Sequence, residues 1–492
     1  MADAAHPAPP VLPARRLIGL ILGPVVGAAM LLSPPPATMP PEAWTAAALV
    51  ALMAILWLTE AIPIAATALI PLGLTPLIGA GSLAATARPY ASPLVFLILG
   101  GFIIGQAMQK CRLHLRLALL IMRLSGVRAD RVVGGVMIAT AALSMWISNT
   151  ATAAMMAPIA LSVVAMLAAE DARGAALLGP ALMLGVAFGA NIGGMATLIG
   201  TPPNAVIAAY LGEAYGVEVT FAGWMALGLP ITLGMLLLAW LSLTRLSFRL
   251  RAAALTGVGE MVARERAAMG PMGVGERRVA LVFGLTVVTW LFRPILSDLL
   301  PAGSELTDAG VAMLAAVLLF MIPENLREGR FLMDWEATKG LPWGVLILVG
   351  GGLSLGASID SSGLAAWIGE RMTGLSAAPL AVSILVVAAA TMAVSHIASN
   401  TATAAALAPV VAALAVSIGA EPMALAAPMA LAASCAFMLP VATPPNAIAH
   451  GTGVVDTATM ARAGAVVSVV ALAMILIAGL LVARTGFGAL PV

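Results

Sequence analysis

Charged residues are scarce in this chain. Lys and Arg number 24 and Asp and Glu number 22 among 492 residues, or 9% of the sequence. A soluble domain carries about 25% charged residues, so this chain has too few to keep a folded surface solvated in water. Its net charge of +2 is small, and no Lys/Arg run alternates with aromatic residues. The composition therefore excludes a soluble globular protein and a nucleic-acid-binding groove.

Cysteine and histidine are also rare. The two cysteines, Cys111 and Cys435, lie far apart without metal-ligand spacing, and the four histidines form no HExxH or paired pattern. These absences exclude a disulfide scaffold and a zinc site. What the chain has in abundance is apolar residues, which make up 61% of it. Apolar runs of about 20 residues, the length that crosses a bilayer, recur from Arg16 onwards, so we predict an all-α polytopic membrane protein.

Hydropathy and turn residues predict eleven transmembrane helices, at 16–33, 44–59, 62–79, 92–109, 174–197, 221–243, 279–297, 308–323, 341–358, 424–440 and 460–483. Two further apolar regions, 132–167 and 382–417, are each interrupted at the centre by Ser-Asn-Thr. Their halves are short for separate crossings, so we predict two re-entrant helical hairpins, which a membrane tolerates only inside protein or beside a cavity. The Pro-rich N-terminus and the apolar run after it are interpreted as a tail and a retained first span, not a signal peptide.

Basic residues predict the orientation of the chain in an inner (plasma) membrane. Segment 110–131 holds six Lys or Arg against one acid, and segment 245–278 holds seven Arg against three acids. With eleven spans, both segments fall on the same side of the membrane as Arg15 and Arg16. Because Lys and Arg are enriched in cytoplasmic loops, we expect the N-terminus in the cytoplasm and the C-terminus outside.

The two halves of the chain share two motifs in the same order. Residues 144–158 read SMWISNTATAAMMAP and residues 395–409 read SHIASNTATAAALAP, at an offset of 251 residues. The motif Thr-Pro-Pro-Asn-Ala follows each of them, starting at Thr201 and at Thr443. An odd number of spans between the copies inverts the second one, which is typical of secondary transporters. We therefore expect four segments: 1–40 (tail and first span), 41–248 (first repeat), 249–278 (cytoplasmic basic linker) and 279–492 (second repeat).

Both motifs interrupt helices inside the membrane. A helix that stops at Ser-Asn-Thr leaves free C=O groups, which suit a small cation, and the helix that restarts leaves free N–H groups, which suit an anion. The consecutive prolines at 202–203 and 444–445 remove N–H donors and force the helix to unwind. No Lys or Arg lies in either motif. A dianion bound there without countercharge would be costly, which favours co-bound cations and coupling to a sodium gradient.

These motifs, together with Leu-Thr-Glu-Ala-Ile-Pro at 58–63, resemble the divalent-anion:sodium symporter (DASS) family over nearly the whole chain. That family carries succinate, malate, fumarate, citrate or sulfate, and its members are dimers whose transport domains move against scaffold domains by an elevator mechanism. The resemblance implies a homodimeric transporter of small dicarboxylates rather than an enzyme, with Na⁺ as co-substrate.

The resemblance also implies the site residues. One sodium site would use Ser144, Ser148, Asn149 and Gly200. The other would use Ser395, Ala398, Asn400 and Ala442. The substrate carboxylates would contact Asn149, Thr150, Thr201, Asn400, Thr401 and Thr443.

One position departs from the family pattern. Sodium-coupled members often carry a carboxylate just before the second Ser-Asn-Thr, as Thr-Glu-x-x-Ser-Asn-Thr, where this chain has His396. Because histidine is neutral or cationic near neutral pH, His396 could modify or replace cation coupling and give proton coupling or anion exchange. The alternative is a packed histidine whose ring is satisfied by a neighbour.

Other functions remain open on the sequence alone. The same fold could serve a sodium-independent dicarboxylate exchanger, or it could carry sulfate or citrate. A channel is disfavoured because broken inverted repeats around a closed central site suit alternating access. An intramembrane hydrolase with Ser144 or Ser148 as nucleophile and His396 as base is disfavoured, because the serines are duplicated and no orienting acid is near.

Overall fold

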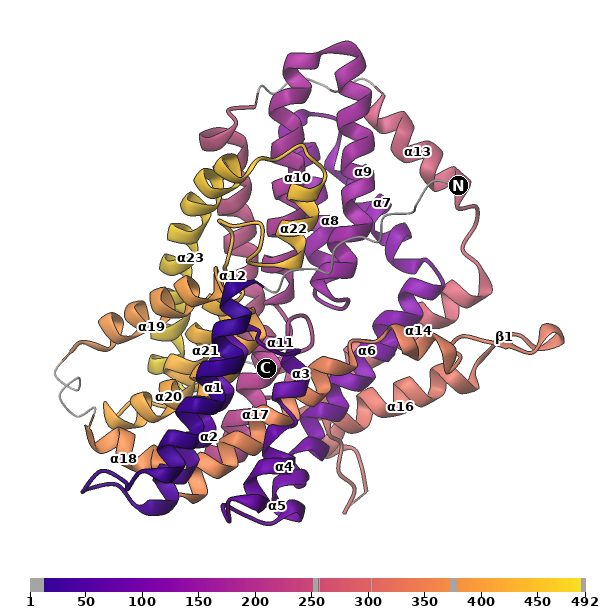
Figure 1. Cartoon of the computed structure of the whole chain (residues 1–492). Helices are drawn as coiled ribbons and strands as arrows, with labels where there is room; N and C mark the ends of the chain where they lie inside the picture. The colour runs from indigo at the N-terminus through magenta and orange to yellow at the C-terminus, as the bar shows by residue number, and fades with distance from the viewer. Residues whose placement is uncertain (1–12, 251–254, 256, 302, 372–377, 488–492) are drawn as a thin grey trace, which may run out of the picture.

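The chain is almost entirely helical. A computed structural model (Figure 1) describes residues 13–250, 255, 257–301, 303–371 and 378–487. In these residues, nine helical stretches are long and apolar enough to cross a membrane by length and composition. The one sheet that the described residues form is the antiparallel pair β1 (Pro323–Asn325) and β2 (Arg330–Phe331), which projects from the side of the molecule. The predicted all-α membrane fold is confirmed.

Most predicted spans of the first half correspond to a helix within a few residues. The helices are α1 (Ala14–Leu32), α2 (Pro41–Thr59), α3 (Ile64–Thr67), α4 (Ile70–Leu77), α5 (Leu83–Ala87), η1 (Arg88–Ala91), α6 (Pro93–Lys110), α7 (Leu113–Ser125), α8 (Ala129–Ser144), α9 (Asn149–Glu170), α10 (Ala172–Gly194), α11 (Pro202–Tyr215), α12 (Phe221–Leu241) and the π-helical turn η2 (Ser242–Ser247).

The second half follows the same plan after a short helix in the predicted basic linker. Its helices are α13 (Val258–Ala268), α14 (Val274–Leu291), α15 (Arg293–Asp298), α16 (Asp308–Met321), η3 (Leu326–Glu328), η4 (Glu336–Gly340), α17 (Trp343–Ser361), α18 (Leu364–Arg371), α19 (Leu380–Ser395), α20 (Asn400–Ser417), α21 (Pro422–Ala433), α22 (Pro444–Gly451) and α23 (Thr457–Thr485).

The two predicted hairpins are present as helix–break–helix pairs. Residues 145–148 separate α8 from α9, and residues 396–399 separate α19 from α20. In the first hairpin the break coincides with Ser-Asn-Thr because Ser148 caps α9, its hydroxyl accepting the Ala151 N–H at 3.3 Å. At 22 and 18 residues, α9 and α20 are longer than the half-crossings that the sequence suggested.

Two other helices stop just before Thr-Pro-Pro-Asn. The chain is unwound between Gly194, where α10 ends, and Pro202, where α11 begins, and again between Ala433 and Pro444. The predicted span at 424–440 is therefore wrong in its second half. The prolines fit the first turn of α11 and of α22, where an N–H would have no partner within the helix.

The predicted span at 62–79 is wrong as one continuous helix. It forms two short helices, α3 and α4, which meet at Ala68 and Leu69. Pro71, in the first turn of α4, has no N–H to continue the helix from α3. At this break α17 crosses, and Gly351 leaves room for the Ala68 carbonyl. That carbonyl accepts a hydrogen bond from the Tyr90 hydroxyl instead of an N–H of its own helix.

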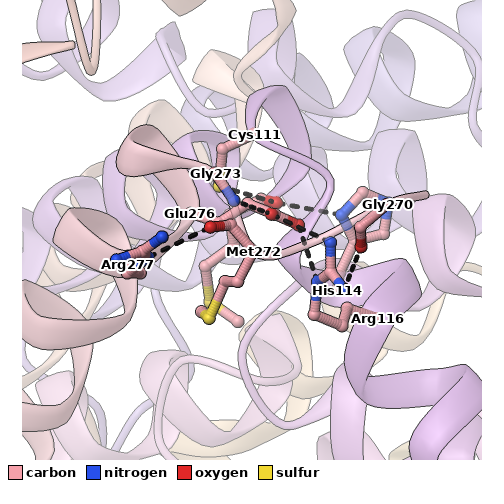
Figure 2. A network of polar contacts seen from close by, with 9 residues as sticks. Cys111, His114, Arg116, Gly270, Met272, Gly273, Glu276 and Arg277 are labelled. Carbon is pink, nitrogen blue, oxygen red and sulfur yellow. Dashed lines mark hydrogen bonds and ion pairs between the residues drawn. The ribbon is translucent and has the colours of Figure 1, made fainter.

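The basic segment at 110–131, predicted as a loop, contains the helix α7. Figure 2 shows how α7 is held against the first turn of α14 and the residues before it: Arg116 donates two N–H bonds to Glu276 at 3.0 Å and one to Gly270 O at 3.1 Å. The Glu276 carboxylate also accepts the Gly273 N–H at 2.7 Å. Burial raises the pKa of this carboxyl, but the hydrogen bonds from Arg116 and Gly273 outweigh burial and hold the pKa below its usual range.

The centre of the fold is α10, in which every residue from 181 to 194 is buried. It packs against α8, α9, α12 and α22. The α8 contact is close because Gly193 has no side chain where it meets the Ala141 backbone. In Figure 1, α22 from the C-terminal part of the chain lies beside α10 from the N-terminal half. The two halves are therefore interleaved rather than separate.

Candidate transport site

A cavity of about 990 Å³ lies where the two halves meet. Its wall contains both hairpin tips (148–150 and 399–401) and both Thr-Pro-Pro-Asn segments (200–202 and 442–445). Further wall residues come from α10, from the N-terminal end of α1 and from residues 60–64 between α2 and α3. The fold thus brings together four motifs that are far apart in sequence.

Most of the predicted site residues reach this cavity. Its wall includes Ser148, Asn149, Thr150, Gly200, Thr201, Asn400, Thr401, Ala442 and Thr443. Four others are buried outside the wall: Ser144, Ser395, His396 and Ala398.

The first half of the site gathers oxygen atoms around Asn149. The Ser144 hydroxyl lies 2.6 Å from Asn149 Oδ1 and 2.8 Å from Ala190 O, and it can donate to either. A Cβ on Gly194 would come within 2.7 Å of Asn149 Oδ1 and 3.0 Å of Gly200 O. Both oxygens can lie this close to residue 194 only because that residue has no side chain. Uncharged amide and carbonyl oxygens are the ligands that a hard cation prefers, so this group fits Na⁺.

The second half of the site contains oxygen atoms without partners. Ser395 Oγ and Asn400 Oδ1 are buried and accept or donate no hydrogen bond. They occupy the positions that Ser144 and Asn149 hold in the first repeat, where the hydroxyl and the amide oxygen contact each other. Buried polar atoms normally have a partner, and orphaned acceptors are satisfied by a ligand or an ion. The residues present therefore fit a cation here as well.

The asparagine of each Thr-Pro-Pro-Asn motif holds the unwound chain before it. Asn204 Nδ2 lies 2.8 Å from Thr197 O and 3.2 Å from Gly194 O. Asn446 Nδ2 lies 2.9 Å from Ala436 O and 3.0 Å from Leu439 O. These amides replace helical N–H donors for the freed carbonyls, so each unwound segment keeps a fixed path.

Asn191 links the two halves, a role that no sequence motif indicates. Its Nδ2 donates to Thr443 Oγ1 at 3.0 Å and to Asn446 Oδ1 at 3.3 Å, and all three residues are buried. The same position before the second Thr-Pro-Pro-Asn is Ala433, so no symmetric bond exists. The contact forms because α10 packs beside α22, an arrangement that only the structure reveals.

His396 packs behind the second tip. Its Nδ1 lies 2.7 Å from Met392 O, and its Nε2 accepts the Met438 N–H at 3.2 Å. Both ring nitrogens are thus satisfied by a neutral ring with the proton on Nδ1. This geometry is the one that the packed-histidine alternative predicts. It also ties the tip to the unwound segment between α21 and α22.

Two charged residues of the wall lie outside the hairpin tips and the Thr-Pro-Pro-Asn segments. The first turn of α1 brings Arg16 to the cavity, and the end of α2 brings Glu60. Arg15 pairs with Glu60 at 3.1 Å and donates to the Ile397 carbonyl of the second tip at 3.0 Å. One guanidinium therefore reaches the wall from α1, in addition to the neutral groups of the duplicated motifs.

These features define the class of the protein. Two duplicated hairpins and two unwound helices meet at one cavity in an apolar helical protein, which is the architecture of a secondary transporter. A family profile described as the sodium:sulfate symporter transmembrane region matches residues 14–485. The chain therefore belongs to this family, the divalent-anion:sodium symporters.

Individual relatives agree with this assignment. The chain is 38% identical over 468 residues to a protein of Staphylococcus saprophyticus named sodium-dependent dicarboxylate transporter SdcS, covering 94% of this chain and 90% of the relative. A Staphylococcus aureus protein of the same name is 38% identical over 472 residues, with the same coverage.

Two solved structures share the fold. The Alcanivorax borkumensis YdaH transporter has a TM-score of 0.57 at 18% identity and covers 97% of this chain and 98% of its own. Neisseria gonorrhoeae MtrF has a TM-score of 0.55 at 14% identity and covers 80% of this chain and 83% of its own. At these identities the likeness concerns the fold alone.

Proposed function

We propose that this protein is a secondary active transporter that moves small dicarboxylates, of the succinate, malate and fumarate class, together with sodium ions. The observation that carries the proposal is the meeting of both hairpin tips at one cavity, beside buried oxygens that have no protein partner. Relatives with 38% identity are named sodium-dependent dicarboxylate transporters, which supports the same substrate class and the same ion.

Each site residue has a role in this proposal. Sodium ions bind at Ser144, Ser148, Asn149 and Gly200 in the first half and at Ser395, Ala398, Asn400 and Ala442 in the second. The substrate carboxylates contact Asn149, Thr150, Thr201, Asn400, Thr401 and Thr443. An asparagine amide suits both tasks, because its oxygen accepts and its NH₂ group donates. The bound cations offset the charge of the dianion, which lowers the cost of removing it from water.

The proposal also covers the location, assembly and motion of the protein. The protein acts in the inner membrane as a homodimer, with the N-terminus in the cytoplasm and the C-terminus outside. Its two repeats are at 41–248 and 279–492, and its transport domains move against scaffold domains by an elevator mechanism. The 249–278 linker joins the two repeats on the cytoplasmic side.

Catalysis is not part of the proposed function. The Ser144 hydroxyl contacts Asn149 Oδ1 and Ala190 O, whereas the His396 ring contacts the backbone of Met392 and Met438. Within the described chain, the structure gives no serine–histidine hydrogen bond at this site. A nucleophile needs a base within hydrogen-bond reach, so this arrangement favours binding over hydrolysis.

A sodium-independent dicarboxylate exchanger is the second candidate. The observation that favours it is His396, which stands where sodium-coupled members often have a carboxylate. The backbone partners of the His396 ring support a structural role for it, and the first candidate is preferred for that reason.

Substrate competition in proteoliposomes tests the proposal. Labelled succinate is expected to enter only when sodium is present, and malate and fumarate should compete better than citrate or sulfate. Asn400→Ala should abolish uptake, whereas Asn325→Ala, in the half-buried β1 strand away from the cavity, should not. Competition by sulfate alone, or normal uptake by a well-folded Asn400→Ala protein, would contradict the proposed substrate or the proposed site.

A further inference from the structure

Among the described residues, the Arg16 guanidinium at the cavity wall has no acidic partner. Arg16 and Glu60 are the only titratable side chains among the described residues of the wall. Arg16 Nε is buried and has no hydrogen-bond partner. A half-buried cation without a partner has lost part of its hydration with no compensating interaction, and a bound anion would supply that interaction.

The charges at this part of the wall do not cancel. Glu60 is engaged by Arg15, whose Nη2 lies 3.1 Å from Glu60 Oε2 and whose Nη1 donates to Ile397 O. In the part of the chain that the structure describes, no ion pair involves Arg16. Arg15 therefore offsets Glu60, and Arg16 leaves the wall with one uncompensated positive charge.

We propose that Arg16 is a substrate-binding and selectivity residue, whose guanidinium binds a carboxylate of the dicarboxylate in the cavity. This inference rests on the proposed function. It adds a contact from α1, outside both repeats, to those of the hairpin tips and the Thr-Pro-Pro-Asn threonines. A substrate with two charges gains more from this residue than a substrate with one, because the tips and their cations meet one end of the molecule and Arg16 meets the other.

The chemistry of the side chain suits this role. A guanidinium presents its donors in a planar fork that matches a carboxylate, and it stays charged at any physiological pH. Low dielectric in a partly enclosed cavity strengthens the attraction compared with open water. Arginine rather than lysine is therefore expected to be the better residue here.

Initial rates of labelled succinate uptake into proteoliposomes test the proposal at a fixed sodium gradient. Arg16→Gln should raise the KM for succinate about tenfold, or about 1.4 kcal/mol, and leave kcat within about twofold. Arg16→Lys should give a smaller rise. Monomethyl succinate carries one charge, so Arg16→Gln should change its inhibition constant far less than it changes the KM for succinate. The matched control is Arg173→Gln, an exposed arginine in the first turn of α10 that does not line the cavity.

An unchanged succinate KM in well-folded Arg16→Gln overturns the inference, and so does an equal KM rise in the Arg173→Gln control. Failure of the wild-type protein to take up succinate would instead count against the proposed function, whatever the variants do. The two failures are thereby separated.

A second variant keeps the test decisive if Arg16→Gln does not fold. Uptake by Arg16→Cys should improve when a cationic methanethiosulfonate reagent restores a positive charge, and it should not improve with a neutral reagent of similar size. Wild-type protein treated in the same way controls for reaction at Cys111 and Cys435. Equal effects of the two reagents would contradict a charge-dependent contact.

Discussion

The two repeats offer a matched pair of serines whose surroundings differ. Ser144 contacts Asn149 Oδ1 and Ala190 O at 2.6 and 2.8 Å, whereas the equivalent Ser395 Oγ is buried with no partner. Ser144→Ala should therefore destabilise the protein whether or not sodium is present. Ser395→Ala should cost nothing without sodium, because it removes an oxygen that makes no bond in the protein.

The size of each effect follows from the contacts. Removing the Ser144 hydroxyl leaves a buried acceptor without its donor, which costs about 1–3 kcal/mol. In domains of 150–250 residues each kcal/mol moves the midpoint of unfolding by about 2–4 °C, so a larger chain should lose a few degrees at most. If Ser395 Oγ is a sodium ligand, its loss should weaken sodium binding about tenfold and remove up to about 1.4 kcal/mol of the stabilisation that sodium supplies.

Thermal unfolding of the purified protein in detergent measures both effects. Each variant is heated in sodium chloride and in choline chloride at equal ionic strength, and the apparent Tm values are compared with the wild type. The reasoning is refuted if Ser395→Ala loses as much stability in choline as Ser144→Ala does. It is also refuted if Ser395→Ala keeps the full sodium-induced rise in Tm, since the orphaned hydroxyl would then not face a cation.

Two further predictions concern the first half-site and α7. Gly194→Ala should abolish uptake, because its Cβ would lie 2.7 Å from Asn149 Oδ1. Gly212→Ala on α11 should retain uptake, because its Cβ meets no atom closer than 3.7 Å. Equal uptake by the two variants would contradict the geometry. Glu276→Gln should lower the apparent Tm at pH 7 through loss of about 1–3 kcal/mol of charged hydrogen bonding to Arg116. Since the pKa of Glu276 is lowered in the fold, this contribution is complete above the ordinary Glu pKa of about 4.3 and is lost as the pH falls below it. The difference in Tm between wild type and variant should therefore shrink in acid, and a constant difference down to pH 3 would be inconsistent with the ion pair.

The parts of the fold that the sequence predicts best depend on local chemistry. Helix breaks at Ser-Asn-Thr and at consecutive prolines depend on adjacent residues, so the local sequence predicts them. Their duplication shows that they are not accidental. The convergence of both tips on one cavity follows from the same repeat, and most predicted site residues line it.

The parts that the sequence does not reveal depend on distant contacts. The contacts of the Ala68 carbonyl with Gly351 and Tyr90 join distant segments, whereas Pro71 is a local signal for the break itself. From the sequence, Asn191 is part of a flexible glycine-rich stretch. Its hydrogen bonds to the Thr-Pro-Pro-Asn segment become known only when α22 is placed beside it. Arg16 reads as a charge at the start of a span until α1 is packed against the tips.

The prediction missed α7 for a different reason. The charge count of segment 110–131 favoured a loop, although the apolar residues Leu113, Ala118, Leu119 and Met122 lie on the buried face of a helix. Helical spacing of apolar residues was the signal that could have found it. The ion pair that anchors α7 to Glu276 in the first turn of α14 could not have been inferred, because the two segments are far apart in sequence.

Coupling of dicarboxylate movement to sodium can be tested in one uptake experiment. Labelled succinate uptake is measured in proteoliposomes with and without an inward sodium gradient, each with and without unlabelled succinate inside. We expect accumulation in empty vesicles that depends on the sodium gradient. Uptake that requires internal succinate and ignores sodium would contradict this coupling, would establish an exchanger, and would make His396 the first residue to mutate.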